Sequence, residues 1–112
     1  MAQIRWQDSA KKHLRQIFDY YYDHASAAVA LSVRGAILEY VERLQDFPLY
    51  GKQDVLFSTE NVQYYFLVVR WRRRTYKVYY QFENDVCSIL AIWDCSMNPG
   101  NLQDWLFEYY SN

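Results

Sequence analysis

The densest group of chemically capable side chains lies in the segment RWRRRTYKVYY, residues 70–80, which places four arginines and one lysine within eight positions. These are five of the twelve basic residues of the chain, and none follows Lys77. Such a cluster can stabilise a developing negative charge, grip phosphates or attract an acidic protein. It can also be a solvated hairpin whose charges keep a sheet edge soluble. The elements around the cluster must decide between these roles.

Length and composition indicate a single domain. At 112 residues, with 52% hydrophobic and 20% aromatic residues, the chain is predicted to form one core over residues 1–112. The net charge of −1 gives no whole-molecule attraction to nucleic acid, so direct DNA binding is not expected. The sequence shows no signal-peptide pattern and no apolar stretch of spanning length, so a cytoplasmic location without membrane contact is expected.

The two cysteines, Cys87 and Cys95, fall on one predicted strand. Eight residues of strand separate them by about 26 Å, which is too far for a disulfide bond. The spacing Cys-x₇-Cys without nearby histidines does not bind metal, so neither a metal nor a cofactor is predicted. Cys87 is expected in the core, whereas Cys95 could be exposed and has no base beside it to make it a nucleophile.

Residues 2–44 predict a short strand followed by two helices. The alternating segment 2–6 suits a strand, and Asp8 or Ser9 can cap the helix behind it. Ser26 can cap a second helix, in which Gly35 would allow close backbone packing. His13, beside Lys12, is expected to be an exposed helix residue. Apolar residues recur at helical spacing at Leu14, Ile17, Phe18 and Tyr21, and again at Ala30, Val33, Ile37, Tyr40, Val41 and Leu44.

The second half of the chain predicts a sheet. Pro48 and Gly51 end the second helix, and residues 62–71, 75–83 and 86–95 read as strands. Residues 101–110 could form a last short helix. The predicted fold is therefore α+β, with an antiparallel helical hairpin packed on an antiparallel sheet of about four strands.

Alternation along the strands assigns their faces. If both strands extend into the basic run, Arg70, Arg72 and Arg74 share one face. Lys77 and Tyr79 are expected on the open, concave side of the sheet, with Arg70 reaching the same side. The more apolar set should cover the helices; it comprises Tyr76, Val78, Tyr80 and Phe82.

The order of these motifs resembles a known family. The chain has an N-terminal strand, a helical hairpin and a Phe-Pro-x-x-Gly turn at residues 47–51. A basic strand then leads into Tyr-Lys-Val-Tyr-Tyr at 76–80, and an apolar strand ends in Ile-Trp-Asp at 92–94, with Asn-Pro close behind. Over residues 3–100 this resembles the RelE/ParE superfamily of bacterial toxin–antitoxin modules, often labelled plasmid stabilisation proteins. The resemblance implies a compact toxin with a concave sheet, over which a cognate antitoxin wraps.

The family contains two mechanisms. RelE-like members resemble ribonucleases that cut messenger RNA on the ribosome with the help of cations and a proton donor or acceptor. If this chain is such a nuclease, the resemblance assigns catalysis to Arg70 or Arg72, Lys77, and the phenol of Tyr109 or Tyr110. The arginine that follows the last strand in those members falls near Cys95 or Ser96, neither of which carries a full positive charge.

That departure favours the second mechanism, in which ParE-like members resemble non-enzymatic inhibitors of DNA gyrase. The interpretation is a toxin that inhibits its target by protein–protein binding and is neutralised by an antitoxin. The alternatives are a ribosome-dependent endoribonuclease, whose partners are the ribosome and messenger RNA, and a degenerate toxin that retains only antitoxin binding. The predicted binding surface for target or antitoxin comprises Arg70, Arg72, Arg73, Arg74, Lys77 and Tyr79.

Overall fold

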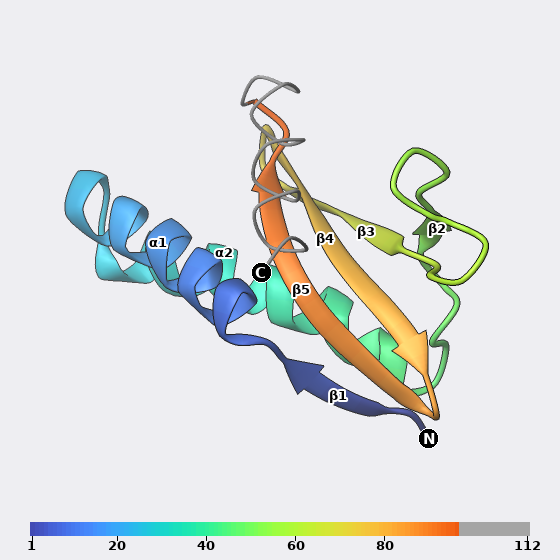
Figure 1. The fold of residues 1–112 in the computed structure, drawn as a ribbon. Helices are drawn as coiled ribbons and strands as arrows, with labels where there is room; N and C mark the ends of the chain where they lie inside the picture. Colours follow the sequence, from blue (N-terminus) through green and yellow to red (C-terminus); the bar gives the residue numbers. More distant parts are fainter. Residues whose placement is uncertain (97–112) are drawn as a thin grey trace.

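A computed structural model describes residues 1–96 of the chain (Figure 1). The predicted C-terminal helix at 101–110 lies outside these residues. None of the helices within residues 1–96 is long and apolar enough to cross a bilayer. The elements in chain order are β1 (Gln3–Trp6), α1 (Asp8–His24), α2 (Ala27–Glu42), a short 3₁₀ helix (Arg43–Gln45), β2 (Lys52–Gln53), β3 (Tyr65–Trp71), β4 (Arg74–Glu83) and β5 (Val86–Asp94).

The fold is the predicted α+β arrangement of a helical hairpin on a sheet. The sheet has five strands in the order β1-β5-β4-β3-β2, because residues 52–53 add a short edge strand that the sequence did not indicate. It is mixed rather than wholly antiparallel, since β1 runs parallel to β5. The long connection through both helices makes this parallel pairing possible, and it brings the first strand beside the last.

The helices form where the apolar spacing predicted them. Ser26 caps α2, accepting a hydrogen bond from the backbone N–H of Val29 at 3.1 Å. The first helix differs from the prediction: Gln7 is its N-cap residue and contributes no side-chain cap. The predicted caps, Asp8 and Ser9, are instead the first two residues of the helix, and the Ser9 hydroxyl donates to the backbone carbonyl of Leu90 on β5, at 2.6 Å.

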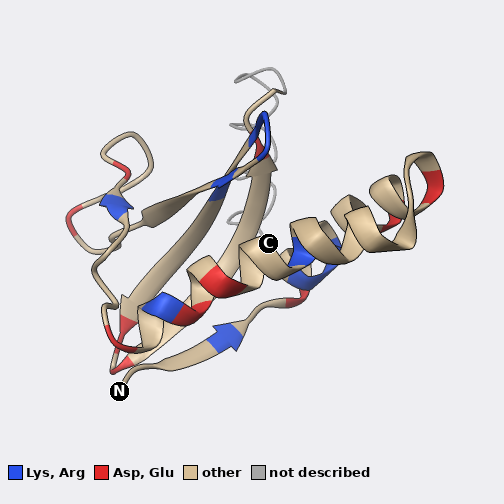
Figure 2. Cartoon of the chain, turned by 180° about the vertical axis from the view of Figure 1, so that it is seen from behind, with Lys and Arg blue, Asp and Glu red and all other residues tan. Residues whose placement is uncertain are grey.

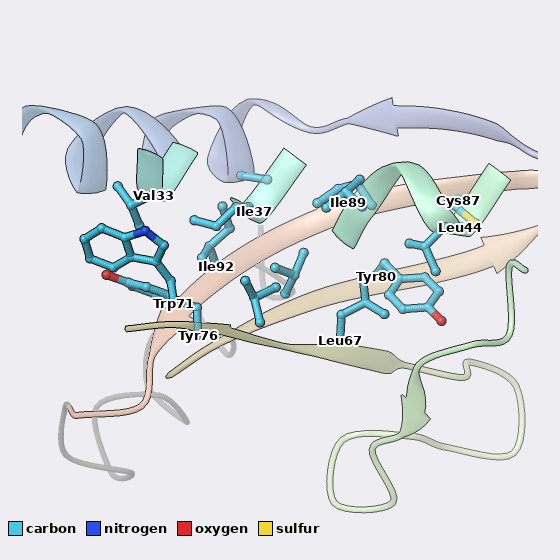
Figure 3. Close-up of a cluster of buried hydrophobic side chains, with 14 of the residues drawn as sticks. Val33, Ile37, Leu44, Leu67, Trp71, Tyr76, Tyr80, Cys87, Ile89 and Ile92 are labelled. Carbon is cyan, nitrogen blue, oxygen red and sulfur yellow. The ribbon is translucent and has the colours of Figure 1, made fainter. Parts of the chain in front are cut away.

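The main core lies between the helices and one face of the sheet (Figure 3). Val33, Ile37 and Leu44 project from the second helical segment onto the sheet, and all three are fully buried. Burial of each such side chain contributes about 1.5–3 kcal/mol to folding. The sheet contributes the face predicted to cover the helices, with Tyr76, Val78 and Tyr80 buried and Phe82 partly buried against the cluster.

Gly51 allows the chain leading into β2 to approach Tyr80 closely. A Cβ atom at Gly51 would lie 2.6 Å from the hydroxyl oxygen of Tyr80 and 2.8 Å from the carbonyl oxygen of Phe66. The Gly51 N–H donates to the Tyr80 hydroxyl at 2.9 Å, while burial raises the pKa of Tyr80 to about 12. Gly35 differs: nothing lies within 4 Å of a Cβ added there, so the predicted close packing at Gly35 is wrong.

Alanine substitutions at Gly51 and Gly35 are therefore expected to change the free energy of unfolding in opposite directions. Gly51→Ala should lower the free energy of unfolding by about 1–3 kcal/mol, because the added methyl group collides with the buried Tyr80 and with backbone. Gly35→Ala should raise it by up to about 1 kcal/mol, because alanine favours the helix interior and meets no neighbour. Urea denaturation of both variants measures this, and equal changes in the two would contradict the packing described.

Helix α1 completes the outer edge of β5 beyond the end of β1. Strand pairing stops at Trp6 opposite Ile89, and the N–H of Gln7 then donates to the Ile89 carbonyl at 2.9 Å. The Ser9 hydroxyl meets the Leu90 carbonyl, and Nδ1 of His13 accepts the N–H of Ile92 at 3.1 Å. The expectation of an exposed His13 is therefore wrong, because its ring is buried as the acceptor for a strand amide.

Burial, followed by the nearby charge of Lys12, lowers the pKa of His13 to about 4 from its usual 6.5. Nδ1 must be unprotonated to accept the Ile92 N–H, so the folded chain holds the neutral ring. The unfolded chain binds a proton below pH 6.5, whereas the folded chain does so only near pH 4. Stability due to this group is therefore fully present above pH 6.5 and is lost as the pH falls toward 4.

We expect the free energy of unfolding to decrease by up to about 3 kcal/mol through His13 alone between neutral pH and pH 4. His13→Gln offers an amide oxygen to Ile92 but does not titrate, so this part of the pH dependence should disappear in the variant. The measurement is urea denaturation of both chains across this pH range. Parallel pH profiles would show that His13 is not buried as a neutral acceptor.

Candidate functional site

The basic cluster forms the tip of the β3–β4 hairpin (Figure 2). Trp71 pairs with Arg74, so Arg72 and Arg73 form a two-residue turn, in which Arg72 has a φ of 54°. Residues other than glycine rarely adopt this left-handed geometry, yet the turn is built from two arginines. We call the four arginines at this hairpin end the basic tip: Arg70, Arg72, Arg73 and Arg74. Three of them are exposed, and Arg74 is half-buried.

Trp71 anchors the basic tip to the helices. Its indole Nε1 donates to the Ser32 hydroxyl of α2 at 3.0 Å, and its ring meets the edge of Tyr21 of α1 at 5.1 Å between centroids. The guanidinium of Arg72 lies 4.7 Å from the centre of the same ring. A cation above a tryptophan ring is held there by the electron-rich face. The tip is therefore positioned by a buried aromatic residue that the sequence analysis did not single out.

The arginines of the tip divide between the two faces of the sheet. Arg70 lies opposite Thr75 and on the same face as Lys77, as predicted. Arg74 lies opposite Trp71, and thus on the helix side, so the prediction that Arg70, Arg72 and Arg74 share a face is wrong. Paired residues of a hairpin share a face, and the two turn residues interrupt the alternation on which the prediction relied.

Arg74 forms an ion pair and a hydrogen bond with residues at and after the end of β5. Its guanidinium lies 3.8 Å from the Asp94 carboxylate at the end of β5 and donates to the Ser96 hydroxyl at 3.1 Å. The same hydroxyl and the Ser96 N–H both donate to Asp94, at 2.8 and 2.9 Å. The positive charge of Arg74 is therefore compensated by the Asp94 carboxylate.

A groove runs beside Arg74 between α1 and the hairpin. Its volume is about 470 Å³. On its floor the hydroxyls of Tyr21 and Tyr76 lie 3.3 Å apart, and burial followed by this hydrogen bond raises the pKa of Tyr76, which keeps its phenol protonated. The groove is lined by His13, Gln16, Ile17, Tyr20, Tyr21, Arg74, Tyr76, Ile92 and Asp94.

Lys77 stands on the open face of the sheet. It lies opposite Val68 on β3 and Trp93 on β5, and its ammonium group is 4.7 Å from the centre of the Phe66 ring. Cys95 is exposed and Cys87 is buried, as expected. Burial raises the pKa of Cys95 although nearby Lys77 lowers it, so the thiol form prevails at neutral pH. Cys95 therefore has little nucleophilic character.

Tyr79 lies on the predicted face of the sheet but is not exposed. Its residual exposure is 1%, because Phe66 and Phe57 cover it in a second small core with Ala91 and Trp93. Phe57 belongs to the loop before β3, where the Asp54 carboxylate accepts the N–H groups of Leu56 and Phe57 at 2.9 and 3.2 Å. The expectation of an open Tyr79 is therefore wrong, and burial raises the pKa of its phenol.

The nuclease candidates are only partly brought together. Arg70 and Lys77 share the open face of the sheet, whereas Arg72 belongs to the turn. Tyr109 and Tyr110 lie outside the described residues. On the open face of the sheet the structure thus places exposed Arg70 and half-exposed Lys77. On the helix side it places Arg74, whose charge is compensated by Asp94.

Comparison with known proteins identifies the family. Residues 4–99 match the family described as the ParE toxin of type II toxin–antitoxin system, parDE. The match covers most of the chain, which therefore belongs to the ParE toxin family, within the RelE/ParE superfamily of type II toxins. A solved structure described as the chromosomal ParDE TA system from P. aeruginosa is similar, with a TM-score of 0.64 and 21% identity over 84% of this chain and 96% of that chain. No curated protein matches the sequence.

Burial along β4 predicts a contrast between neighbouring residues. Lys77→Ala should leave the free energy of unfolding within about 0.5 kcal/mol of the parent, because its ammonium group is at the surface. Tyr79→Ala should cost about 3–5 kcal/mol and Val78→Ala about 1–3 kcal/mol, because each empties a buried site. Thermal and urea denaturation measure the series, with Tyr79→Phe as a control that keeps the ring. A silent Tyr79→Ala would show that the loop does not cover this residue.

Proposed function

We propose that this chain is the toxin of a type II toxin–antitoxin pair, that it inhibits a cellular target such as DNA gyrase by binding to it, and that a cognate antitoxin neutralises it. Membership of the ParE toxin family supports the toxin role. The observation that carries the choice of mechanism is the pairing of Arg74 with Asp94 where β5 ends.

Cleavage of RNA develops negative charge on the phosphate, and a nuclease stabilises that charge with cations aimed at it. After β5 the described chain offers Cys95, as a thiol, and Ser96, as a hydroxyl. The nearest arginine, Arg74, already faces a carboxylate that would repel an incoming phosphate. A phosphate that approached this guanidinium would meet the Asp94 carboxylate, which two hydrogen bonds from Ser96 hold in place. This arrangement favours recognition of a protein surface over phosphate chemistry.

The basic tip suits such recognition. Two of its exposed arginines, Arg72 and Arg73, stand on a turn that Trp71 anchors to α2, so little conformational freedom is lost around the anchor when a partner binds. Clustered cations at a rim speed association with an acidic surface more than they raise affinity. The tip therefore supports a role in finding the target or the antitoxin.

One observation favours the ribonuclease alternative. Arg70 and Lys77 share the open face of the sheet, and no acidic residue within residues 1–96 forms an ion pair with either. Two cations on one concave face could hold an RNA backbone. The degenerate-toxin alternative, in which only antitoxin binding persists, predicts no effect on growth.

Expression of the chain alone in bacteria separates the three functions. We expect growth arrest with altered plasmid supercoiling before any loss of protein synthesis, and Arg73→Glu should relieve it at least about tenfold in viable count, whereas Lys11→Glu, a matched reversal on α1, should not. Early codon-dependent cleavage of messenger RNA by primer extension would instead establish the endoribonuclease. Normal growth at full expression would leave only the degenerate toxin.

A further inference from the structure

Helix α2 is apolar on its outer side as well as on the side that faces the sheet. Among positions 27–38 only Ser32 and Arg34 are polar. The side that packs on the sheet is buried and comprises Ala30, Val33, Ile37 and Val41. A helix that is apolar all round is normally covered on every side, whereas Leu31 on the outer side is 57% exposed. The outer side of α2 therefore has the composition of a contact surface.

Gly35 lies on this outer side, on one stripe with Leu31 and Leu38, because residues four and seven positions apart share a helix face. Glycine disfavours a helix interior, and nothing lies within 4 Å of a Cβ added at this position. Packing inside the chain therefore gives no reason for a glycine here. A second surface that approached the backbone of α2 closely would give one.

A groove between α1 and α2 opens beside the stripe, and its volume is about 490 Å³. Its apolar walls are half-buried side chains: Trp6, Leu14, Phe18 and Leu38. Leu38 thus belongs both to the stripe and to the groove. The outer side of α2 therefore carries an apolar projection, Leu31, and an apolar hollow at Leu38, two turns further along the helix.

A projection and a hollow on the same surface suit the association of two identical chains, because each copy then inserts into the other. A two-fold axis that passes between Arg34 and Gly35 would set α2 antiparallel to α2 of a second copy. Leu31 of each copy would then face the partner's Leu38 and enter the groove beside it. Gly35 would lie at the axis, where a side chain would hold the two backbones apart.

The charges on this surface are complementary under the same axis. Arg34 would lie beside the partner's Gly35, one helical turn from the partner's Glu39. Arg34 and Glu39 are both exposed, and neither forms an ion pair within residues 1–96. The axis would therefore create two arginine–glutamate pairs between the copies.

We propose that two copies of the chain associate through the outer side of α2, with Leu31 of each copy inserted into the α1–α2 groove of the other. This association is independent of the proposed function, since it uses neither the basic tip nor the open face of the sheet. The contact involves few side chains, so the dimer should form reversibly at micromolar concentrations.

Sedimentation of the purified full chain between about 1 and 100 μM measures the association. We expect a monomer–dimer equilibrium whose Kd rises at least about tenfold in Leu31→Glu, because the charge cannot enter the apolar groove. Leu49→Glu is the matched control, since Leu49 is 59% exposed and lies outside this surface. A parent chain that stays monomeric at about 100 μM would overturn the proposal and leave the surface to a different protein. A dimer that Leu31→Glu leaves unchanged would also overturn it.

A charge exchange tests the pairing of Arg34 with the partner's Glu39. Arg34→Glu should raise the Kd of the dimer at least about tenfold, because it sets two carboxylates against each other. Adding Glu39→Arg to the same chain should restore the dimer, since both pairs are then re-formed with the charges reversed. A double variant as weak as the single one would overturn this arrangement of the two helices.

A disulfide between the copies tests the antiparallel register. In a chain that carries Cys95→Ser, the pair Leu31→Cys and Leu38→Cys should give a covalent dimer on mild oxidation. Within one helix these positions are about 10.5 Å apart, which is too far for a disulfide. Leu31→Cys alone should stay uncrosslinked, because it faces the partner's position 38. Equal crosslinking of the single and the double variant would contradict the register.

Gly35→Ala separates association from the stability of the single chain. The methyl group should weaken the dimer at least about threefold, because it lies at the two-fold axis. It should still stabilise the separated chain, which urea denaturation measures at a protein concentration below the Kd of the dimer. A dimer as tight as that of the parent would show that Gly35 does not lie at the contact.

Discussion

The arrangement of the whole molecule depends on the hydrogen bonding of α1 to the free edge of β5. Four helical residues rise about 6.0 Å and two strand residues about 6.6 Å, so a helix can present side chains every fourth residue to every second residue of a strand. Ser9 and His13 meet Leu90 and Ile92 at this spacing. These bonds satisfy a strand edge that β1 is too short to cover. They also fix the direction in which α1 crosses the sheet.

That direction places the aromatic end of α1 against the hairpin. Tyr21 contacts both Trp71 and Tyr76, and Trp71 in turn holds the turn that carries the arginines. The charged end of the hairpin is therefore connected to the main core through Trp71. The same hairpin gives its two faces different roles, since Arg74 is compensated beside Asp94 whereas Arg70 is exposed on the open face of the sheet.

Periodicity in the sequence was enough to predict both helices, the three long strands and the inward set on β4. The remainder depended on distant contacts. The side of the sheet on which Arg74 lies depends on the two-residue length of the hairpin turn. The burial of His13 depends on its hydrogen bond with the amide of Ile92, 79 residues away along the chain. Tyr79 is covered by a loop that has no periodic pattern, although Phe57 in that loop was a possible signal. Asp94, the last residue of β5, was the available signal for a partner to Arg74.

Inhibition by binding is the central claim, and a purified system tests it most directly. The chain is added to DNA gyrase and relaxed plasmid in the absence of ribosomes, with the charge-reversed variant Arg73→Glu as the comparison. The account predicts that the parent chain blocks supercoiling in proportion to its concentration and that the variant is at least about tenfold weaker. Full gyrase activity at saturating toxin, together with cleavage of messenger RNA once ribosomes are supplied, would contradict it.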